Sequence, residues 1–418
     1  MTTTRTPLPE DFLWGVSIAG HQNDGDDVTS DTSFLENVTP TVFREPSGPA
    51  TRHWERWEED LDLVAAMGLT AFRFSVEWAR VEPERGVIDA AALDHYEAIV
   101  EGCLARGIAP LVTFSHFTAP HWFAARASWL APEAPADFAR FCGLVMDRIG
   151  DRIVAAVTLN EPNLPRVLQS GHLPSEAWAM QQACLDAASR AAGVERYRVG
   201  NVVLLEETEA MEDGLVLAHR AAKAAIKARR ADLPVGLSIA IIDDVALPGG
   251  EANRDTKRAR CYDRWLELAR EDDFVGVQNY ERVLHGPEGV VEPSPELPRN
   301  EMGTAIFAGS LAGAVRYAHE RSGVPVLVSE HGMATGDDAL RAAFIPAAIA
   351  ELLDAMADGV PVLGYCHWTL MDNFEWIFGY GMQLGLHAVD RTTFERTPKG
   401  SARAYAEVVR RLTSERAA

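Results

Sequence analysis

Cysteine is scarce in this chain of 418 residues, and the few cysteines that occur are scattered. There are five of them, an odd number: Cys103, Cys142, Cys184, Cys261 and Cys366. This usage argues against a disulfide framework and against a zinc cage, whose cysteines come in closely spaced pairs. We therefore expect reduced thiols and a cytoplasmic location.

Long apolar runs are also missing. No segment approaches the roughly 20 consecutive apolar residues that a membrane-spanning helix needs. The segment Met1–Glu10 is polar and contains proline, and it lacks the apolar central stretch of a secretory signal peptide. The sequence thus predicts neither a membrane anchor nor a signal peptide.

Positive charge is in short supply, with 39 Lys and Arg against 61 Asp and Glu, a net charge of −22. Such a chain repels phosphate backbones and anionic lipid headgroups, so nucleic acids and membrane surfaces are poor partners. A glycine-rich phosphate-binding loop is absent, and the spacing of His116 and His121 does not match the H-E-x-x-H zinc motif. We expect no cofactor, no bound metal and a small-molecule substrate.

What the chain does contain is a repeated pattern of short apolar runs, each followed by a turn and a helical stretch. Near-continuous apolar runs predict strands that are buried on both faces, as in a parallel sheet covered by helices. The eight predicted strands are Phe12–Ser17, Leu69–Val76, Ala109–His116, Ala155–Glu161, Pro234–Ile241, Asp273–Tyr280, Pro325–Glu330 and Val362–Leu370. The clearest helices between them are predicted at Thr51–Met67, Ala91–Arg106, Gly214–Arg230 and Ser310–Arg321.

Eight strands alternating with helices predict an α/β fold, a single (β/α)8 TIM barrel with extended βα loops that spans residues 1–418 as one catalytic domain. A doubly wound open sheet is the alternative, but it would place a glycine-rich turn after its first strand. The segments Pro162–Asn201 and Gly286–Gly303 follow predicted strand ends. We expect both to be extended loops that shape substrate access.

Polar side chains gather at the carboxyl ends of the predicted strands, where barrels of this kind place their chemistry. Glu161 and Glu330 end two of these strands and would face each other across the barrel mouth. Such a pair suits glycosidic cleavage, because one protonated carboxyl serves the leaving oxygen while the other attacks the anomeric carbon or activates water. Trp368, Trp376 and Trp122 would stack on sugar faces.

Each of these residues, taken singly, also has an ordinary structural explanation. A lone glutamate at a strand end is usually a cap or a solvated loop residue. Trp54 and Trp57 lie at helical spacing and are expected to pack rather than to bind. The combination, not any one residue, favours a neutral carbohydrate as the substrate.

Several motifs together resemble family 1 glycoside hydrolases, the β-glucosidase and β-galactosidase family, over nearly the whole chain. In chain order they are Phe12–Val16 with Gln22 and Gly25, Phe72–Val76 with Trp78 and Arg80, Thr158–Pro162, Val328–Gly332, and Gly364–Trp368 with Asp372–Trp376. They are similar to the family elements F-L-W-G, R-F-S-x-x-W-x-R, T-[FL]-N-E-P, [IV]-T-E-N-G and W-S-L-x-D-N-F-E-W. One such match would be weak, but several in order are specific.

The resemblance implies roles for individual residues. Glu161 would be the general acid/base and Glu330 the nucleophile of a retaining double displacement, with carboxyl groups about 5–5.5 Å apart. Asn160 would bond the sugar 2-hydroxyl. The remaining hydroxyls would be held by Gln22, His116, Glu375 and Trp376, with Trp368 as platform, and Arg73 and Tyr280 would hydrogen-bond Glu330 and keep it ionised.

Glu375 also indicates the substrate class, because family members that act on 6-phosphorylated sugars replace this glutamate. The neighbouring segment Gly379–Gln383 offers no cation for a phosphate, so an unphosphorylated glycoside is expected. Departures from the family pattern occur at Asp24, Phe117, Thr118, Gln278, Asn279, Thr304 and His331. They leave the predicted catalytic pair intact and leave the identities of the sugar and the aglycone open.

Three functions remain. The first is a retaining β-glycosidase that hydrolyses an unphosphorylated β-glucoside-like substrate. The second is a transglycosylase that moves a glycosyl group to an acceptor alcohol with the same two carboxylates. The third is a catalytically silent sugar-binding protein, whose expected mark is the loss of Glu161 or Glu330, and both are present.

Overall fold

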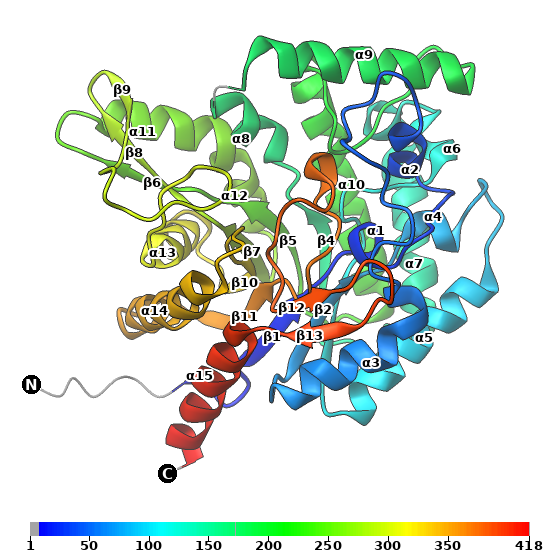
Figure 1. Cartoon of the computed structure of the whole chain (residues 1–418). Coiled ribbons are helices and arrows are strands. Elements are labelled where there is room, and N and C mark those ends of the chain that lie inside the picture. The colour runs from blue at the N-terminus through cyan, green and yellow to red at the C-terminus, as the bar shows by residue number, and fades with distance from the viewer. Residues whose placement is uncertain (1–7, 172, 418) are drawn as a thin grey trace, which may run out of the picture.

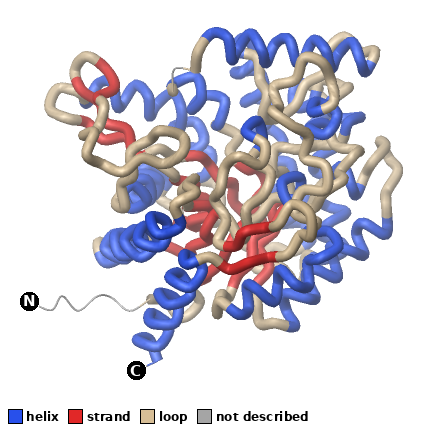
Figure 2. The backbone as a smooth tube through the Cα atoms, in the orientation of Figure 1, coloured by secondary structure: helices blue, strands red, loops and turns tan. Residues whose placement is uncertain are grey.

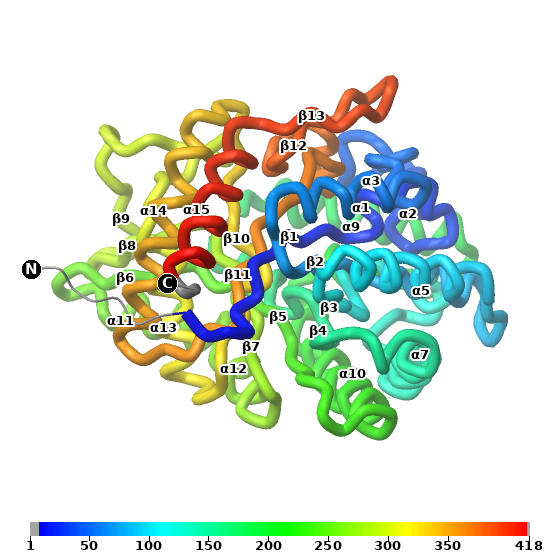
Figure 3. Tube along the Cα trace, turned by 90° about the horizontal axis from the view of Figure 1, so that it is seen from below, coloured from blue at the N-terminus to red at the C-terminus, as the bar shows by residue number. Residues whose placement is uncertain are grey.

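Eight parallel strands close into a barrel at the centre of the computed structural model, which describes residues 8–171 and 173–417 (Figures 1 and 3). Around the ring the order is β1-β11-β10-β7-β5-β4-β3-β2. Their bounds are β1 Leu13–Ser17, β2 Ala71–Ser75, β3 Ala109–Thr113, β4 Ala155–Asn160, β5 Val235–Ala240, β7 Phe274–Asn279, β10 Val326–His331 and β11 Val362–Trp368. Each matches one predicted run, so the predicted TIM barrel is confirmed.

Helices surround the barrel, as Figures 2 and 3 show. The longer ones are α3 His53–Ala66, α5 Ala90–Ala105, α7 Ala134–Ile149, α9 Ser175–Ala192, α10 Thr208–Arg229, α13 Ser310–Ser322, α14 Asp338–Ala357 and α15 Gly400–Ala417. Shorter helices are α1 Gly20–Asn23, α2 Asp31–Glu36, α4 Trp78–Val81, α6 His121–Ala124, α8 Leu164–Ser170, α11 Glu251–Arg258 and α12 Arg264–Ala269. Single turns lie at η1 Ser128–Leu130, η2 Leu205–Glu207, η3 Ala259–Asp263 and η4 Trp376–Phe378. Within the described ranges, no helix combines the length and the apolar character needed to cross a membrane.

The predicted start of α10 at Gly214 was wrong, because the helix begins six residues earlier, at Thr208. Glycine weakens a helix interior and often marks a boundary. Here it has a packing reason: a Cβ atom on Gly214 would lie 1.9 Å from the carbonyl oxygen of Trp129. Helix α10 therefore approaches the η1 turn closely only because this residue has no side chain.

The two predicted extended loops contain regular structure. The segment 162–201 holds α8 and the 18-residue helix α9, which ends at Gly193 with a left-handed φ of 68°. The segment 286–303 begins within a small sheet of β6 Asp243–Ala246, β8 Arg282–Gly286 and β9 Gly289–Val291. A second hairpin pairs β12 His387–Val389 with β13 Arg396–Pro398. Strands of three to five residues are too short for a reliable alternation signal.

The barrel interior has two parts. The lower part, toward the amino ends of the strands, is apolar, and the upper part, toward their carboxyl ends, is polar. The lower part is filled by the buried side chains of Ala71, Leu111, Ala155, Val157, Phe274 and Leu327. Two residues along β2 from Ala71, on the same face, lies the fully buried Arg73. A guanidinium inside a barrel needs carboxylate or amide partners, so the polar upper part is where a functional site is expected.

Candidate active site

Glu161 and Glu330 both lie at the carboxyl end of a barrel strand, and both strands are irregular just before them. The pairing of β4 with β5 shifts register between Val157 and Asn160, and the pairing of β10 with β7 shifts between Val328 and Glu330. Regular alternation from the inward-facing Leu327 would turn Glu330 outward. Such irregularities re-aim side chains next to active sites, and here they direct Glu330 into the barrel.

Two donors hold the Glu330 carboxylate. Arg73 Nη1 lies 2.6 Å from Oε1, and the Tyr280 hydroxyl donates to Oε2 at 2.7 Å. Burial raises the pKa of Glu330, while the Arg73 charge and the two hydrogen bonds oppose that rise. Both predicted contacts are present, and they stabilise the ionised form of Glu330.

Glu161 sits in a different environment. It follows β4 in a left-handed conformation, with φ of 45°, and its side chain is only partly buried. Burial raises the pKa of Glu161 well above its ordinary value, and the negative charge of Glu330 raises it further. Among the described residues, no side chain is recorded as donating a hydrogen bond to this carboxyl group. Of the two glutamates, Glu330 therefore ionises first and Glu161 keeps its proton.

Asn160 directly precedes Glu161 and contacts Arg73, the same arginine that holds Glu330. Its Oδ1 accepts hydrogen bonds from Arg73 Nη2 at 2.5 Å and from Gln278 Nε2 at 2.6 Å. Its Nδ2 lies 3.3 Å from Nε2 of His116. His116 is buried, which lowers the pKa of its ring well below the usual value, so this histidine is neutral.

Gln22 and Glu375 form a second polar group at the mouth. Gln22 Nε2 donates to the Phe374 carbonyl at 2.9 Å and to Glu375 Oε2 at 3.2 Å. Gln22 Oε1 is buried without a protein partner, which leaves an acceptor for a ligand hydroxyl. Burial, together with the charge of Glu330, raises the pKa of Glu375 to about 8.

A set of stacked rings forms one wall. His116 lies parallel to Trp368, with centroids 5.5 Å apart, and to Trp376, with centroids 6.2 Å apart. His21 continues the stack beyond Trp376. Phe117, one of the departures from the family pattern, meets Trp376 edge to face at 5.3 Å. The structure thus brings Trp368 and Trp376 to the same site as the carboxylates.

Trp122 does not join this wall, and the expectation that it stacks on a sugar is not supported. Its indole N–H donates to the Glu82 carbonyl at 2.9 Å, and its ring packs against Trp78 in the core between strands and helices. Trp54 packs on His95 with centroids 3.8 Å apart, as the helical spacing predicted. The presence of a tryptophan in the sequence does not show whether its ring packs in the core or faces the site. That depends on which side of its helix or loop faces the barrel.

The departures fall into two groups. His331 and Asn279 turn away from the barrel interior, since His331 bonds the Tyr365 hydroxyl at 2.9 Å and stacks on Phe344 of α14, while Asn279 accepts from Ser310 of α13. Gln278 and Phe117 are in contact with predicted site residues, and the Thr118 N–H donates to the His116 carbonyl at 2.9 Å.

Glu77 is a residue that the sequence analysis did not single out. Thr118, which stands where the family has an aspartate, donates to Glu77, whose other oxygen accepts from Ser75 at 2.5 Å. Burial raises the pKa of Glu77 to about 7. The Thr118 hydroxyl thus contacts a carboxylate that comes from the segment after β2. The contact between Thr118 and Glu77 joins two segments that are distant in the sequence, so only the folded structure reveals it.

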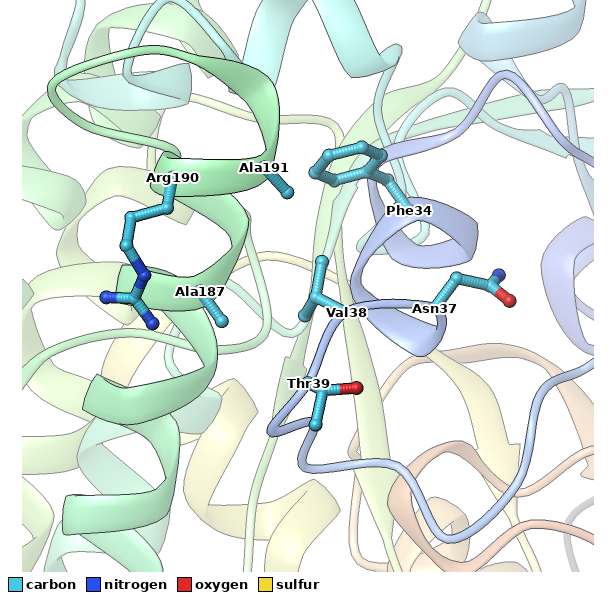
Figure 4. Close-up of a pocket in the computed structure, with 7 residues that line it drawn as sticks. All are labelled: Phe34, Asn37, Val38, Thr39, Ala187, Arg190 and Ala191. Atoms are coloured by element: carbon cyan, nitrogen blue, oxygen red, sulfur yellow. The ribbon is translucent and has the colours of Figure 1, made fainter.

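A surface cavity of about 430 Å³ lies elsewhere, between α2 and α9 (Figure 4). Its lining consists of Phe34, Asn37, Val38, Thr39, Ala187, Arg190 and Ala191. None of these is a predicted site residue, and the lining has no carboxylate or nucleophile, so the cavity is not the catalytic centre. In the described part of the chain, His, Cys, Asp and Glu side chains do not form a group that could hold a metal ion.

Comparison with known proteins shows the family of the chain. The model of glycosyl hydrolase family 1 matches residues 4–260 and 267–413. The chain belongs to glycosyl hydrolase family 1. It is therefore a glycoside hydrolase by family, as the motifs indicated. The predicted catalytic pair lies in the part of the chain that the family model covers.

Relatives match along almost their full length. β-Glucosidase A of Thermotoga maritima is 28% identical over 435 residues, which cover 96% of this chain and 98% of that protein. The β-glucosidase of an Agrobacterium species is 29% identical, with 96% and 95% covered. Among solved structures, the β-glycosidase BGL167 has a TM-score of 0.92 at 45% identity, covering 97% of this chain and 98% of its own. The T. maritima β-glucosidase in complex with deoxynojirimycin has a TM-score of 0.83 at 26% identity, with 97% and 98% covered.

Proposed function

We propose that this family 1 member is a retaining β-glycosidase that hydrolyses an unphosphorylated β-glucoside-like substrate. The observation that carries the proposal is the asymmetry between the two glutamates. Glu330 is held by Arg73 and Tyr280, whereas Glu161 lies close enough for the charge of Glu330 to raise its pKa and has no donor of its own. One carboxyl is thus suited to attack and the other to give a proton.

In the first step, a Glu330 oxygen bonds to the anomeric carbon while the bond from that carbon to the leaving oxygen breaks. Glu161 transfers its proton to the leaving oxygen, which departs as an alcohol. The glycosyl ester on Glu330 carries no charge, so the part of the rise in the pKa of Glu161 that came from the Glu330 charge is removed, while the effect of burial stays. Glu161 then accepts a proton from water, whose oxygen bonds to the anomeric carbon while the bond from that carbon to Glu330 breaks. The sugar is released with its original anomeric configuration.

The rest of the site supports binding of the sugar. Asn160 directly precedes Glu161, and its Nδ2 lies 3.3 Å from His116 Nε2. We assign this Nδ2 to the 2-hydroxyl, which interacts most strongly in the transition state. Gln22, His116 and Glu375 are assigned to the other hydroxyls, with Trp368 and Trp376 against the apolar sugar face. Glu375 stands without a neighbouring cation in Gly379–Gln383, which favours an unphosphorylated sugar. All five cysteines are free and buried, which supports a reducing compartment such as the cytoplasm.

Hydrolysis of a panel of p-nitrophenyl glycosides, α and β, over several sugars tests the proposed function. We expect release of nitrophenol from β-glucoside, β-galactoside or β-fucoside and none from the α-linked compounds. Adding an acceptor alcohol separates hydrolysis from glycosyl transfer, since a transglycosylase converts most of the glycosyl group to a new glycoside. Turnover of α-glycosides only, or a sugar that binds the purified protein without any turnover of β-glycosides, would contradict the proposal.

Replacement of Tyr280 by phenylalanine is expected to move the acid limb of the profile of kcat/KM against pH. The Tyr280 hydroxyl stabilises the Glu330 carboxylate, so its loss raises the pKa of Glu330 and shifts the acid limb to higher pH. A hydrogen bond to a charged group contributes roughly 1.5–3 kcal/mol, and one pKa unit corresponds to about 1.4 kcal/mol, which predicts a shift of about 1–2 units. The alkaline limb, set by Glu161, should stay in place.

Tyr262→Phe provides a matched control, because the buried Tyr262 hydroxyl donates to Asp244 in the layer outside the barrel. This control should lower the thermal midpoint of unfolding without moving either limb. An acid limb that stays in place in Tyr280→Phe would show that Tyr280 does not act on Glu330.

A further inference from the structure

Two donors converge on one oxygen of Asn160 deep in the barrel. Arg73 Nη2 and Gln278 Nε2 lie 2.5 and 2.6 Å from Asn160 Oδ1. A guanidinium can only donate, so the oxygen of the Asn160 amide must face Arg73. The nitrogen of the same amide is thereby turned to the opposite side, where it lies 3.3 Å from His116.

Arg73 alone does not hold this orientation securely, because the same guanidinium also serves Glu330 at 2.6 Å and Thr113 at 3.0 Å. During the reaction the charge on Glu330 disappears, and the balance of these contacts changes. Within the described residues, the Gln278 side chain makes no second hydrogen bond of this kind. It faces Asn160 from β7, and it sits beside Glu330 in the register of β7 with β10.

The other end of the Gln278 amide points to the same conclusion. Its Oε1 is buried, with the residue 1% exposed, and has no protein partner. If the Gln278 amide were turned over, its Oε1 would face Asn160 Oδ1, and two hydrogen-bond acceptors would lie against each other. The nitrogen is therefore fixed toward Asn160, and an unpaired acceptor remains within the polar layer.

We propose that Gln278 is a positioning residue that locks the Asn160 amide so that Nδ2 faces the sugar 2-hydroxyl. The inference rests on the proposed glycosidase function and adds a residue to it. Gln278 is one of the departures from the family pattern, and this contact accounts for a glutamine at the end of β7.

The test compares an aryl β-glucoside with the matching aryl 2-deoxy-β-glucoside in wild type and Gln278→Met, which keeps the length of the side chain and removes the donor. The expected loss in kcat/KM on the glucoside is about 10–100-fold, carried mainly by kcat, since the 2-hydroxyl interaction strengthens in the transition state. On the 2-deoxy substrate the loss should stay within about threefold, a limit set by the general scatter of such effects. In an Asn160→Ala background, Gln278→Met should have little further effect.

Two other variants make the test decisive. Gln278→Asn shortens the side chain by one methylene and should show the same selective loss, which covers the case in which Gln278→Met does not fold. Thr158→Val changes a buried polar residue of β4 whose hydroxyl bonds His219 outside the barrel at 2.7 Å, and it should leave the ratio of the two substrates unchanged. Equal losses on both substrates would overturn the positioning role. A wild-type protein inert on every β-glycoside of the panel would instead refute the proposed function.

Discussion

Replacing Glu330 by alanine is expected to lower turnover of every β-glycoside by on the order of 10⁴-fold or more, because no glycosyl ester can form. Glu330 is buried at the end of β10 between Arg73 and Tyr280, so its removal leaves a space beside the anomeric carbon. Azide should enter this space and attack from the same side as the lost carboxylate. The product in the variant would be an α-glycosyl azide, identified by NMR.

Glu212→Ala is the matched control for this variant. Glu212 is also a buried glutamate in contact with an arginine, Arg166, but it lies on α10 outside the barrel. The control should lose stability and keep the catalytic rate within about threefold, as expected for a change away from the site. If Glu330→Ala kept substantial activity without azide, the assignment of the nucleophile would be wrong.

Replacing Glu161 by alanine is expected to give a loss that depends on the leaving group. General acid catalysis contributes typically about 10²–10⁴-fold, and a poor leaving group needs it while an activated one does not. Turnover of an alkyl β-glycoside should therefore fall by that factor, whereas the first step on a dinitrophenyl β-glycoside should change little. Azide should restore turnover of the activated substrate, now giving a β-glycosyl azide.

The opposite anomers of the two azide products form an internal check on the assignment of roles. Azide replaces the nucleophile in Glu330→Ala and the water of the second step in Glu161→Ala. A uniform loss on all leaving groups in Glu161→Ala, without azide rescue, would show that Glu161 is not the acid/base. The same anomer from both variants would show that the two roles are not divided as proposed.

The barrel could be predicted from the sequence because its strands are buried on both faces and read as nearly continuous apolar runs. Strand ends such as Asn160 and Glu161, or Glu330 and His331, stood out as polar residues directly after such runs. Family motifs then added roles. The period of two residues could not show which of Glu330 and His331 faces inward, because the register irregularity of β10 decides it.

Contacts between distant segments were beyond the reach of sequence patterns. The hydrogen bond from Gln278 to Asn160 joins residues that are 118 positions apart in the sequence. The hydrogen bond from Thr118 to Glu77 spans 41 positions. Trp122 illustrates the same limit, since it was expected to stack on a sugar but its indole packs against Trp78 in the surrounding layer. Fine orientation depends on packing partners that only the folded chain identifies.

The measurement that tests the central claim most directly is covalent trapping with an activated 2-deoxy-2-fluoro-β-glucoside. The fluorine slows both steps, and the good leaving group lets the first proceed, so the glycosyl ester accumulates. Digestion of the inactivated wild-type protein and peptide mass spectrometry should place the label on Glu330, and Glu330→Ala should take up none. A label on Glu161, on Glu375 or on any other residue would contradict the account.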